Sequence, residues 1–212
     1  ENSENAAKYY DMILVKDPNS WEANFYVVYY KAMQCKIAEI WSAANNVNNN
    51  IKPVISLIKD NVTDTNDKVM AITEVCLKLD SIATMLYNAA KSHYDGIDYS
   101  IKANFVQEYV NNVAAATQIQ YTFGDTLVEL FSDEFGKQAA IAWGSAVNMH
   151  SGYVKELKDK ETNKNIINQY VDKIKKYDPE FKAPYVDTSG CYIATAVYGS
   201  YDAPQVMVLR QY

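Results

Sequence analysis

The pattern of apolar and polar positions is organised around the stretch from Trp21 to Val47. This stretch contains neither Pro nor Gly, and its apolar residues recur at helical spacing on two faces. A helix that is apolar on two faces usually lies inside a bundle rather than on its surface. We therefore predict one continuous helix over residues 21–47, placed at the centre of the fold and in contact with most of the other helices.

An asparagine-rich segment overlaps the end of this predicted helix. Five of the six residues from 45 to 50 are Asn, which has a low helix propensity. Pro53 follows, and Pro removes a backbone donor from the interior of a helix. The sequence predicts a kink or a break here, followed by a short helix that carries Val54, Ile55 and Ile58.

The rest of the pattern predicts further helices separated by short polar segments. A polar loop at 60–66 precedes them, and Gly124 with Asp125 ends one of them. The predicted helices cover residues 67–93, 100–123, 126–131, 133–157 and 161–178. The fold class predicted by this order of elements is all-α, an irregular bundle of about seven to nine helices.

Composition and charge exclude several classes of partner. The chain has 212 residues, a net charge of -6 and a sequence pI near 5.0. Binding to phosphate groups requires clustered Lys and Arg, so we expect no nucleic acid partner. No apolar run reaches the ~18 residues that a membrane span requires, and no signal peptide is recognisable.

The cysteines indicate the compartment. The three cysteines stand at positions 35, 76 and 191, and this odd number with irregular spacing fits neither a disulfide framework nor a zinc site. We expect Cys35 and Cys76 to be buried as small apolar residues. A reducing compartment is the simplest inference, so we predict a cytoplasmic protein. Because the first residue is not Met, we also expect that the natural chain extends beyond this sequence.

No constellation of residues indicates catalysis or a bound cofactor. His150 lies on an apolar helical stripe, which is typical of a core histidine, and His93 ends a predicted helix. The sequence has no Glu-x-x-His pair, Gly-rich phosphate loop or nucleophile elbow. We therefore predict no catalytic residues, no metal site and no cofactor.

The N-terminal segment carries a short repeat-like pattern. Ala6, Tyr10, Ile13 and Pro18 stand at the spacing 0, +4, +7 and +12, and Asp17-Pro18-Asn19 closes the segment. This pattern resembles the second helix of a tetratricopeptide repeat. In such a unit Ala6 allows close helix approach, Tyr10 and Ile13 fill the seam between helices, and Pro18 ends the helix. The resemblance implies half of a repeat, packed on a different helical domain.

The C-terminal segment, CYIATAVYGSYDAPQVMVLRQY, is the most specific motif of the chain. It resembles the CFI-box found at the C-terminus of many bacterial proteins, with Tyr192 where the motif usually has Phe, and it is cut short at Tyr212. The residues of this motif that we expect to take part in an interaction are Cys191, Tyr192, Ala194, Thr195, Tyr198, Gly199, Ser200, Pro204 and Arg210. The family has no established activity, so the resemblance implies a bacterial source but no reaction.

The tail can also be interpreted from its residues alone. Two short helices on either side of Gly199-Ser200 are expected, and their apolar residues should fold back onto the helical domain. Cys191 follows Ser189-Gly190 at a predicted helix N-terminus, where the helix dipole lowers a thiol pKa. We favour the other interpretation, that Cys191 packs as a small apolar residue, since no His or Lys is close to it in sequence.

These observations define a domain organisation and three functional hypotheses. We predict a half repeat at 1–20, a helical domain at 21–179, a linker at 180–190 and the truncated motif at 191–212. We expect a protein-interaction or scaffold module, not an enzyme, with a protein as its partner. The alternatives are a small-molecule or lipid-binding bundle that uses its Tyr-rich interior as a pocket, and a thiol enzyme or redox sensor based on Cys191. The sequence does not determine the oligomeric state.

Overall fold

The structure is a computed structural model, and it describes residues 2–188 of the chain. Within this range it contains seven α-helices, three short 3-10 helices and no strand, which confirms the predicted all-α class. The α-helices are α1 (Asn2–Lys16), α2 (Trp21–Ala32), α3 (Ile40–Asn61), α4 (Thr65–Asp95), α5 (Val106–Phe131), α6 (Gly136–Ser151) and α7 (Lys160–Lys175). The 3-10 helices are η1 (Ile37–Glu39), η2 (Lys102–Phe105) and η3 (Val154–Glu156). The C-terminal motif, including Cys191, lies outside the described residues.

Side-chain caps begin three of the helices. The Ser20 side chain accepts a hydrogen bond from the Ala23 amide at the start of α2, and Asp64 accepts from the amides of Asn66 and Asp67 at the start of α4. Asp159 caps α7 in the same way. Each cap satisfies amide groups that the helix itself leaves unbonded, so these three polar residues define where the helices begin.

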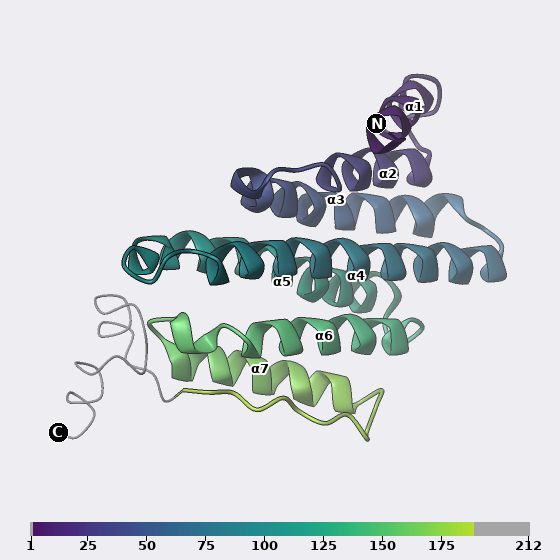
Figure 1. Cartoon of the computed structure of the whole chain (residues 1–212). Helices are drawn as coiled ribbons and strands as arrows, with labels where there is room; N and C mark the ends of the chain where they lie inside the picture. Colours follow the sequence, from purple (N-terminus) through teal and green to yellow (C-terminus); the bar gives the residue numbers. More distant parts are fainter. Residues whose placement is uncertain (1, 189–212) are drawn as a thin grey trace.

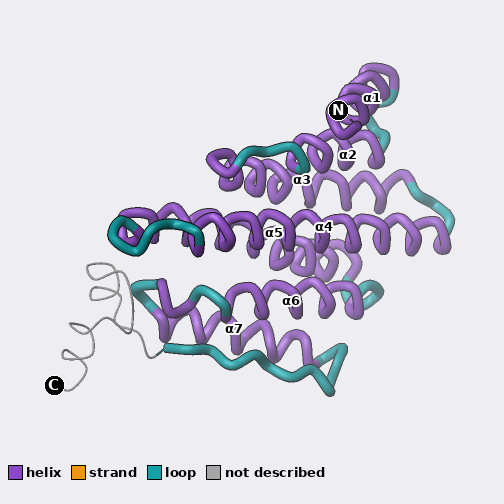
Figure 2. Tube along the Cα trace, in the orientation of Figure 1, coloured by secondary structure: helices purple, strands orange, loops and turns teal. Residues whose placement is uncertain are grey.

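The helices lie side by side in chain order except for α4 (Figure 1). Successive neighbours are α1 and α2, α2 and α3, α3 and α5, α5 and α6, and α6 and α7, while α4 packs across α3, α5 and α6. Figure 2 shows that short loops join most of the helices and that, after a turn at 178–181, the chain runs as an extended segment to residue 188, back along α7. The helix with the most extensive packing is α5, which lies between α3, α4 and α6.

The prediction of a single central helix over 21–47 is wrong. The chain turns at residues 33–36, so that α2 and α3 form a hairpin joined by η1. The turn divides the apolar stripe that begins at Tyr26 between two helices, which pack on each other. A single helix of this length would extend about 40 Å, whereas the hairpin folds the stretch back on itself and buries most of its apolar residues. Ile37, which would lie on the buried face of such a helix, is 38% exposed at the turn.

The predicted break at the asparagine-rich segment is also wrong, because α3 runs without interruption from Ile40 through Pro53 to Asn61. The buried face of α3 continues across this segment with Val47, Ile51 and Val54. Pro53 is exposed, so water can solvate the carbonyl group that loses its amide partner. Burial of the apolar face outweighs the low propensity of Asn and the hydrogen bond lost at Pro53.

Further boundaries also differ from the sequence prediction. The helix predicted from residue 100 begins at Val106, after η2. Gly124 lies within α5 instead of ending it. The indole of Trp143 occupies the space that a side chain at position 124 would take, which explains the glycine at this place in the helix. The helix predicted over 133–157 begins later and ends at Ser151, where Gly152 forms its C-cap. The helices predicted over 67–93 and 161–178 are confirmed as α4 and α7.

Candidate functional site

The N-terminal residues singled out in the sequence lie in the α1–α2 hairpin. The ring of Tyr10 stacks on those of Tyr26 and Tyr30, with centroids 5.0 and 6.1 Å apart, and Pro18 lies in the turn between the helices. Ala6 and Ile13 are half-buried on the same helix. These residues pack one helix against another.

The two histidines lie apart. His93 is exposed in the last turn of α4. His150 is buried, with Nδ1 3.1 Å from the Tyr121 hydroxyl and Nε2 3.0 Å from Asn163 Oδ1. Because the Asn163 oxygen can only accept, Nε2 donates to it and Nδ1 accepts from Tyr121. Burial lowers the pKa of His150, so both nitrogens of the neutral ring have partners in the core.

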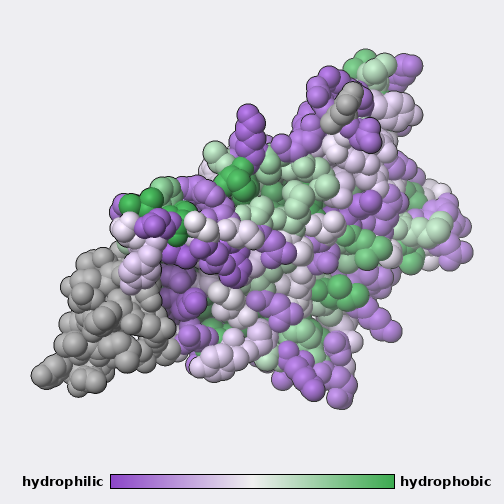
Figure 3. All heavy atoms as spheres, viewed as in Figure 1, coloured by the Kyte–Doolittle hydropathy of each residue, from purple (hydrophilic) through white to green (hydrophobic). Residues whose placement is uncertain are grey.

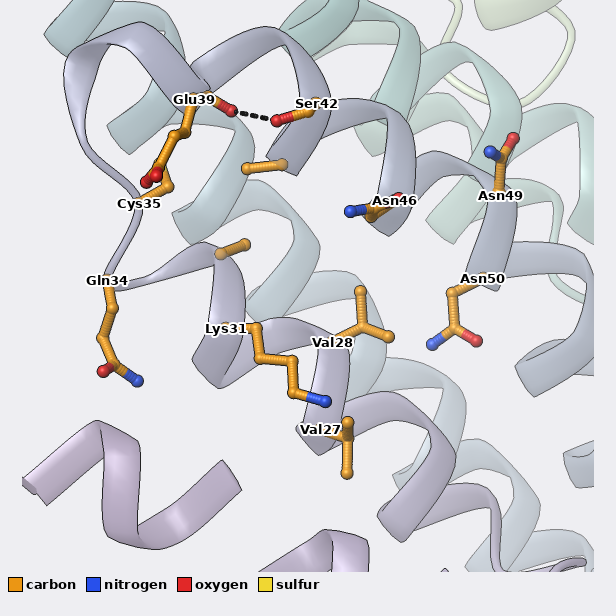
Figure 4. Close-up of a pocket in the computed structure, with 12 residues that line it drawn as sticks. Val27, Val28, Lys31, Gln34, Cys35, Glu39, Ser42, Asn46, Asn49 and Asn50 are labelled. Atoms are coloured by element: carbon orange, nitrogen blue, oxygen red, sulfur yellow. Dashed lines mark hydrogen bonds between the residues drawn. The ribbon is translucent and has the colours of Figure 1, made fainter. Parts of the chain in front are cut away.

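An open groove between α2 and α3 is the candidate binding site. It has a volume of about 520 Å³, and the turn between the two helices closes one end of it. Figure 4 shows Val27, Val28 and Lys31 on α2 opposite Asn46 and Asn50 on α3. The hairpin that the sequence did not predict therefore creates this groove, because it places two faces of one sequence stretch opposite each other.

The floor of the groove is formed by small apolar side chains. Val27, Ala32 and Ala43 are buried, and Val28 is half-buried. Small residues on facing helices leave space that larger side chains would fill. In the space-filling view, a patch of moderately apolar residues gathers over α2 and the first turns of α3, bordered by hydrophilic residues (Figure 3).

The α3 wall carries a row of uncharged polar side chains. Asn46 and Asn49 are exposed and make no hydrogen bond to any described residue through their side chains. Asn50 Nδ2 donates to the Asn24 carbonyl at 2.8 Å, which leaves its Oδ1 atom free to accept. Ser42 Oγ donates to the Glu39 carbonyl at 2.9 Å. The wall therefore presents both donors and acceptors to whatever lies in the groove.

The charged side chains at the groove are already partnered. Lys31 Nζ lies 3.3 Å from a carboxylate oxygen of Asp11 on α1, and Glu39 accepts a hydrogen bond of 2.8 Å from the Lys36 amide. The two charges have opposite sign and lie on opposite sides of the turn. The groove thus has no cluster of like charge that would select an anionic or a cationic ligand.

Cys35 lies at the closed end of the groove and is half-buried. Burial, together with the nearby Glu39 carboxylate, raises the pKa of the Cys35 thiol. A raised thiol pKa lowers the fraction of reactive thiolate at neutral pH. Cys35 is therefore suited to line the groove and is unsuited to act as a nucleophile.

The Tyr-rich interior is tightly packed beside this groove. An enclosed void between α2, α3 and α4, lined by residues that include Phe25, Tyr29 and Leu79, has a volume of only about 10 Å³. That volume is about the minimum for one water molecule. This part of the core therefore holds no space for a small molecule.

Two other surface hollows are present in the described part of the chain. One, of about 500 Å³, lies between α6 and the segment after α7, where Phe181 packs near Gly144. The other, of about 460 Å³, lies where α2 begins and α3 ends, and it is bordered by carboxylates that include Glu22, Asp67 and Glu74.

Among residues 2–188, no group of three or more His, Cys, Asp or Glu side chains is placed to hold a metal ion. In the same range no helix is both long enough and apolar enough to cross a membrane.

Comparison with known proteins gives no match for this chain. No family model matches it, no curated protein matches its sequence, and no solved structure matches its fold. The class of protein that the described residues define is an all-α helical bundle with an open polar groove near its N-terminus.

The pattern of the sequence did not predict this groove. The part of the sequence that could have indicated the groove is the asparagine cluster over 45–50, whose low helix propensity predicted only a break in the helix. On a continuous helix, residues 42, 46 and 50 fall on one face, because positions four apart are neighbours on the helix surface. A row of polar uncharged residues beside a buried apolar stripe is the pattern that could have located the site.

Proposed function

We propose that this chain is a protein-interaction module without catalytic activity, and that the α2–α3 groove is its binding surface. The observation that carries the proposal is the pairing of a small apolar floor with an α3 wall on which the side chains of Asn46 and Asn49 make no hydrogen bond to the described residues and Asn50 keeps its acceptor free. Side chains of a partner polypeptide can fill the floor, and its polar groups can bond to the wall. Bacterial origin, a cytoplasmic location, the tetratricopeptide-like half unit and the CFI-box belong to the same proposal.

The chemistry of the groove favours a polypeptide over the alternatives. Small-molecule sites enclose most of the ligand surface among apolar residues, whereas this groove is open and carries Asn and Gln along its rim. Nucleic acid would require clustered basic residues, and Lys31 is the one basic residue that lines the groove. A thiol reaction at Cys35 is disfavoured by its raised pKa.

Selection of peptides from a random display library tests the proposal. The library is selected on the wild-type chain, and binding is compared with two variants, Asn46→Trp and Asn88→Trp. Asn46 lies in the groove, and Asn88 is an exposed asparagine on α4. An indole at position 46 blocks the groove, while one at position 88 leaves it open.

The expected result is a set of peptides that bind the wild-type chain and Asn88→Trp but not Asn46→Trp. Circular dichroism spectra of both variants must match that of the wild-type chain. Recovery of no peptides, or of peptides that bind all three proteins equally, would show that the groove is not a binding surface.

A further inference from the structure

The α3 wall of the groove has a spacing that matches an extended polypeptide. Ser42, Asn46 and Asn50 stand four residues apart on one helix face. Four residues of α-helix rise about 6 Å. Two residues of an extended strand rise about 6.5 Å, and in a strand every second residue faces the same way. A row with this spacing can therefore meet equivalent main-chain groups of a strand over a few residues.

The hydrogen-bonding groups of this row suit a peptide main chain. The carboxamide of Asn46 has a free donor and a free acceptor, which is the complement of one peptide unit with its C=O and N–H groups. Asn50 retains its Oδ1 acceptor after its bond to Asn24, and this atom can receive the amide two residues further along the ligand. Both side chains extend from α3 toward α2 in Figure 4.

The charge of the groove agrees with this assignment. A peptide main chain is polar but uncharged, and the row opposite it is also polar but uncharged. Lys31 and Glu39 are engaged with Asp11 and the Lys36 amide, so neither needs a charged partner in the ligand. A helical ligand has its own main-chain groups satisfied and docks by apolar anchors at helical spacing, so it would leave the Asn row unused.

We propose that the groove holds its polypeptide ligand as an extended strand, with Asn46 and Asn50 bonded to the ligand main chain at alternate residues. This inference rests on the proposed function and specifies its ligand. Side chains of the intervening residues point to the floor, where Ala32 and Ala43 leave space for small or medium apolar groups.

A backbone N-methyl scan of a groove-dependent peptide tests this inference. Methylation removes one amide donor at a time from the ligand without changing its side chains. Binding of each methylated peptide is measured by fluorescence anisotropy to the wild-type chain, to Asn46→Leu and Asn50→Leu, and to Asn88→Leu as the matched control. Leu has nearly the shape of Asn but cannot form hydrogen bonds.

The expected result is a period of two. Methylation at certain residues weakens binding about three- to tenfold, as expected for loss of one hydrogen bond, and these residues alternate with tolerant ones. For at least one sensitive residue, the penalty disappears in Asn46→Leu or Asn50→Leu and persists in Asn88→Leu. This coupling assigns the bond to a specific side chain.

The two proposals fail in different ways. Peptides that depend on the groove but tolerate methylation throughout, or that bind as helices by circular dichroism, would refute the extended ligand and leave the interaction module intact. Methylation penalties that are the same in all three Leu variants would also refute the main-chain contacts. Failure to recover any groove-dependent peptide would overturn both proposals.

Discussion

The contact between Gly124 and Trp143 makes the substitution Gly124→Ala a strict test of the packing between α5 and α6. A Cβ atom at position 124 would lie 2.4 Å from Trp143 Nε1 and 2.6 Å from its Cδ1 atom. These distances are about 1 Å shorter than ordinary van der Waals contact. The indole would therefore have to move, or the two helices would have to separate.

The surroundings of Trp143 resist such a movement. The side chain is 2% exposed, and its ring lies 6.1 Å from that of Tyr170 and 6.4 Å from that of Tyr177. Overpacking of a tight core typically costs about 1–3 kcal/mol. Alanine gains up to about 1 kcal/mol over glycine within a helix. The net expectation is a loss of about 1 kcal/mol, or a fall in Tm of about 2–4 °C for a chain of this size.

Urea and thermal unfolding followed by circular dichroism measure this loss. Gly96→Ala is the control, because a Cβ there would lie at ordinary contact distance from the carbonyl oxygens of Ser92 (3.4 Å) and His93 (3.6 Å) and the site is exposed. Gly96→Ala should leave the free energy of unfolding unchanged or raise it. The double variant Gly124→Ala/Trp143→Phe should be less destabilised than the sum of its single variants, because a smaller ring accepts the added methyl group. A Gly124→Ala protein more stable than wild type by about 1 kcal/mol would show that the contact is looser than described.

Three further predictions follow from burial. Ile37 is 38% exposed and Ile40 is 1% exposed. Ile37→Asp should therefore change the free energy of unfolding by less than about 1 kcal/mol, whereas Ile40→Asp should unfold the domain. Similar melting temperatures for the two variants would contradict the turn at 33–36. Burial raises the pKa of the Cys35 thiol and raises that of Cys76 to about 11. Iodoacetamide should therefore modify both thiols more slowly than free cysteine at pH 8, and faster as the pH rises, as measured by mass spectrometry of the separate peptides. Modification of either thiol at the rate of free cysteine would refute its burial. Burial lowers the folded-state pKa of His150 below its usual 6.5, so this residue contributes stability that is fully present above about pH 6.5. This contribution decreases as the pH falls, because the unfolded chain then binds the proton more readily than the folded chain. The variant His150→Gln should lose this part of the pH dependence of stability, and an unchanged pH profile would show that His150 does not titrate in this way.

Much of the helical content followed from local pattern. The region of α4 was predicted correctly because its apolar residues keep one helical stripe from Ile72 to Ala90, although the Asp64 cap that begins the helix was assigned to a loop. The sequence did not lead us to predict that α5 lies at the centre of the packing, although no charged residue occurs between Glu108 and Asp125. Such an uncharged stretch indicates a helix that is buried on several sides, and α5 is in fact the helix that contacts α3, α4 and α6.

The candidate groove could not be derived from local pattern, because its two walls form only when the chain turns at 33–36. Nothing at Met33 or Gln34 ends a helix by propensity, since neither is Gly nor Pro. The turn is favoured because it buries most of the apolar residues of 21–47, with both α2 and α3 packed on α4 and with α3 also packed on α5, and that gain depends on where α4 and α5 lie.

The sequence by itself determined the all-α class, the positions of the helices with one clear apolar stripe, and the acidic character of the chain. The tertiary structure decided where continuous helix gives way to a turn and where it does not. At Pro53 and Gly124 local propensity favours an end, but the buried side chains on either side keep the helix intact. The helix propensities of residues differ by up to about 1 kcal/mol, or about 3 kcal/mol for Pro. Burial of one large apolar side chain contributes about 1.5–3 kcal/mol. A few buried side chains therefore outweigh the local preference for ending the helix.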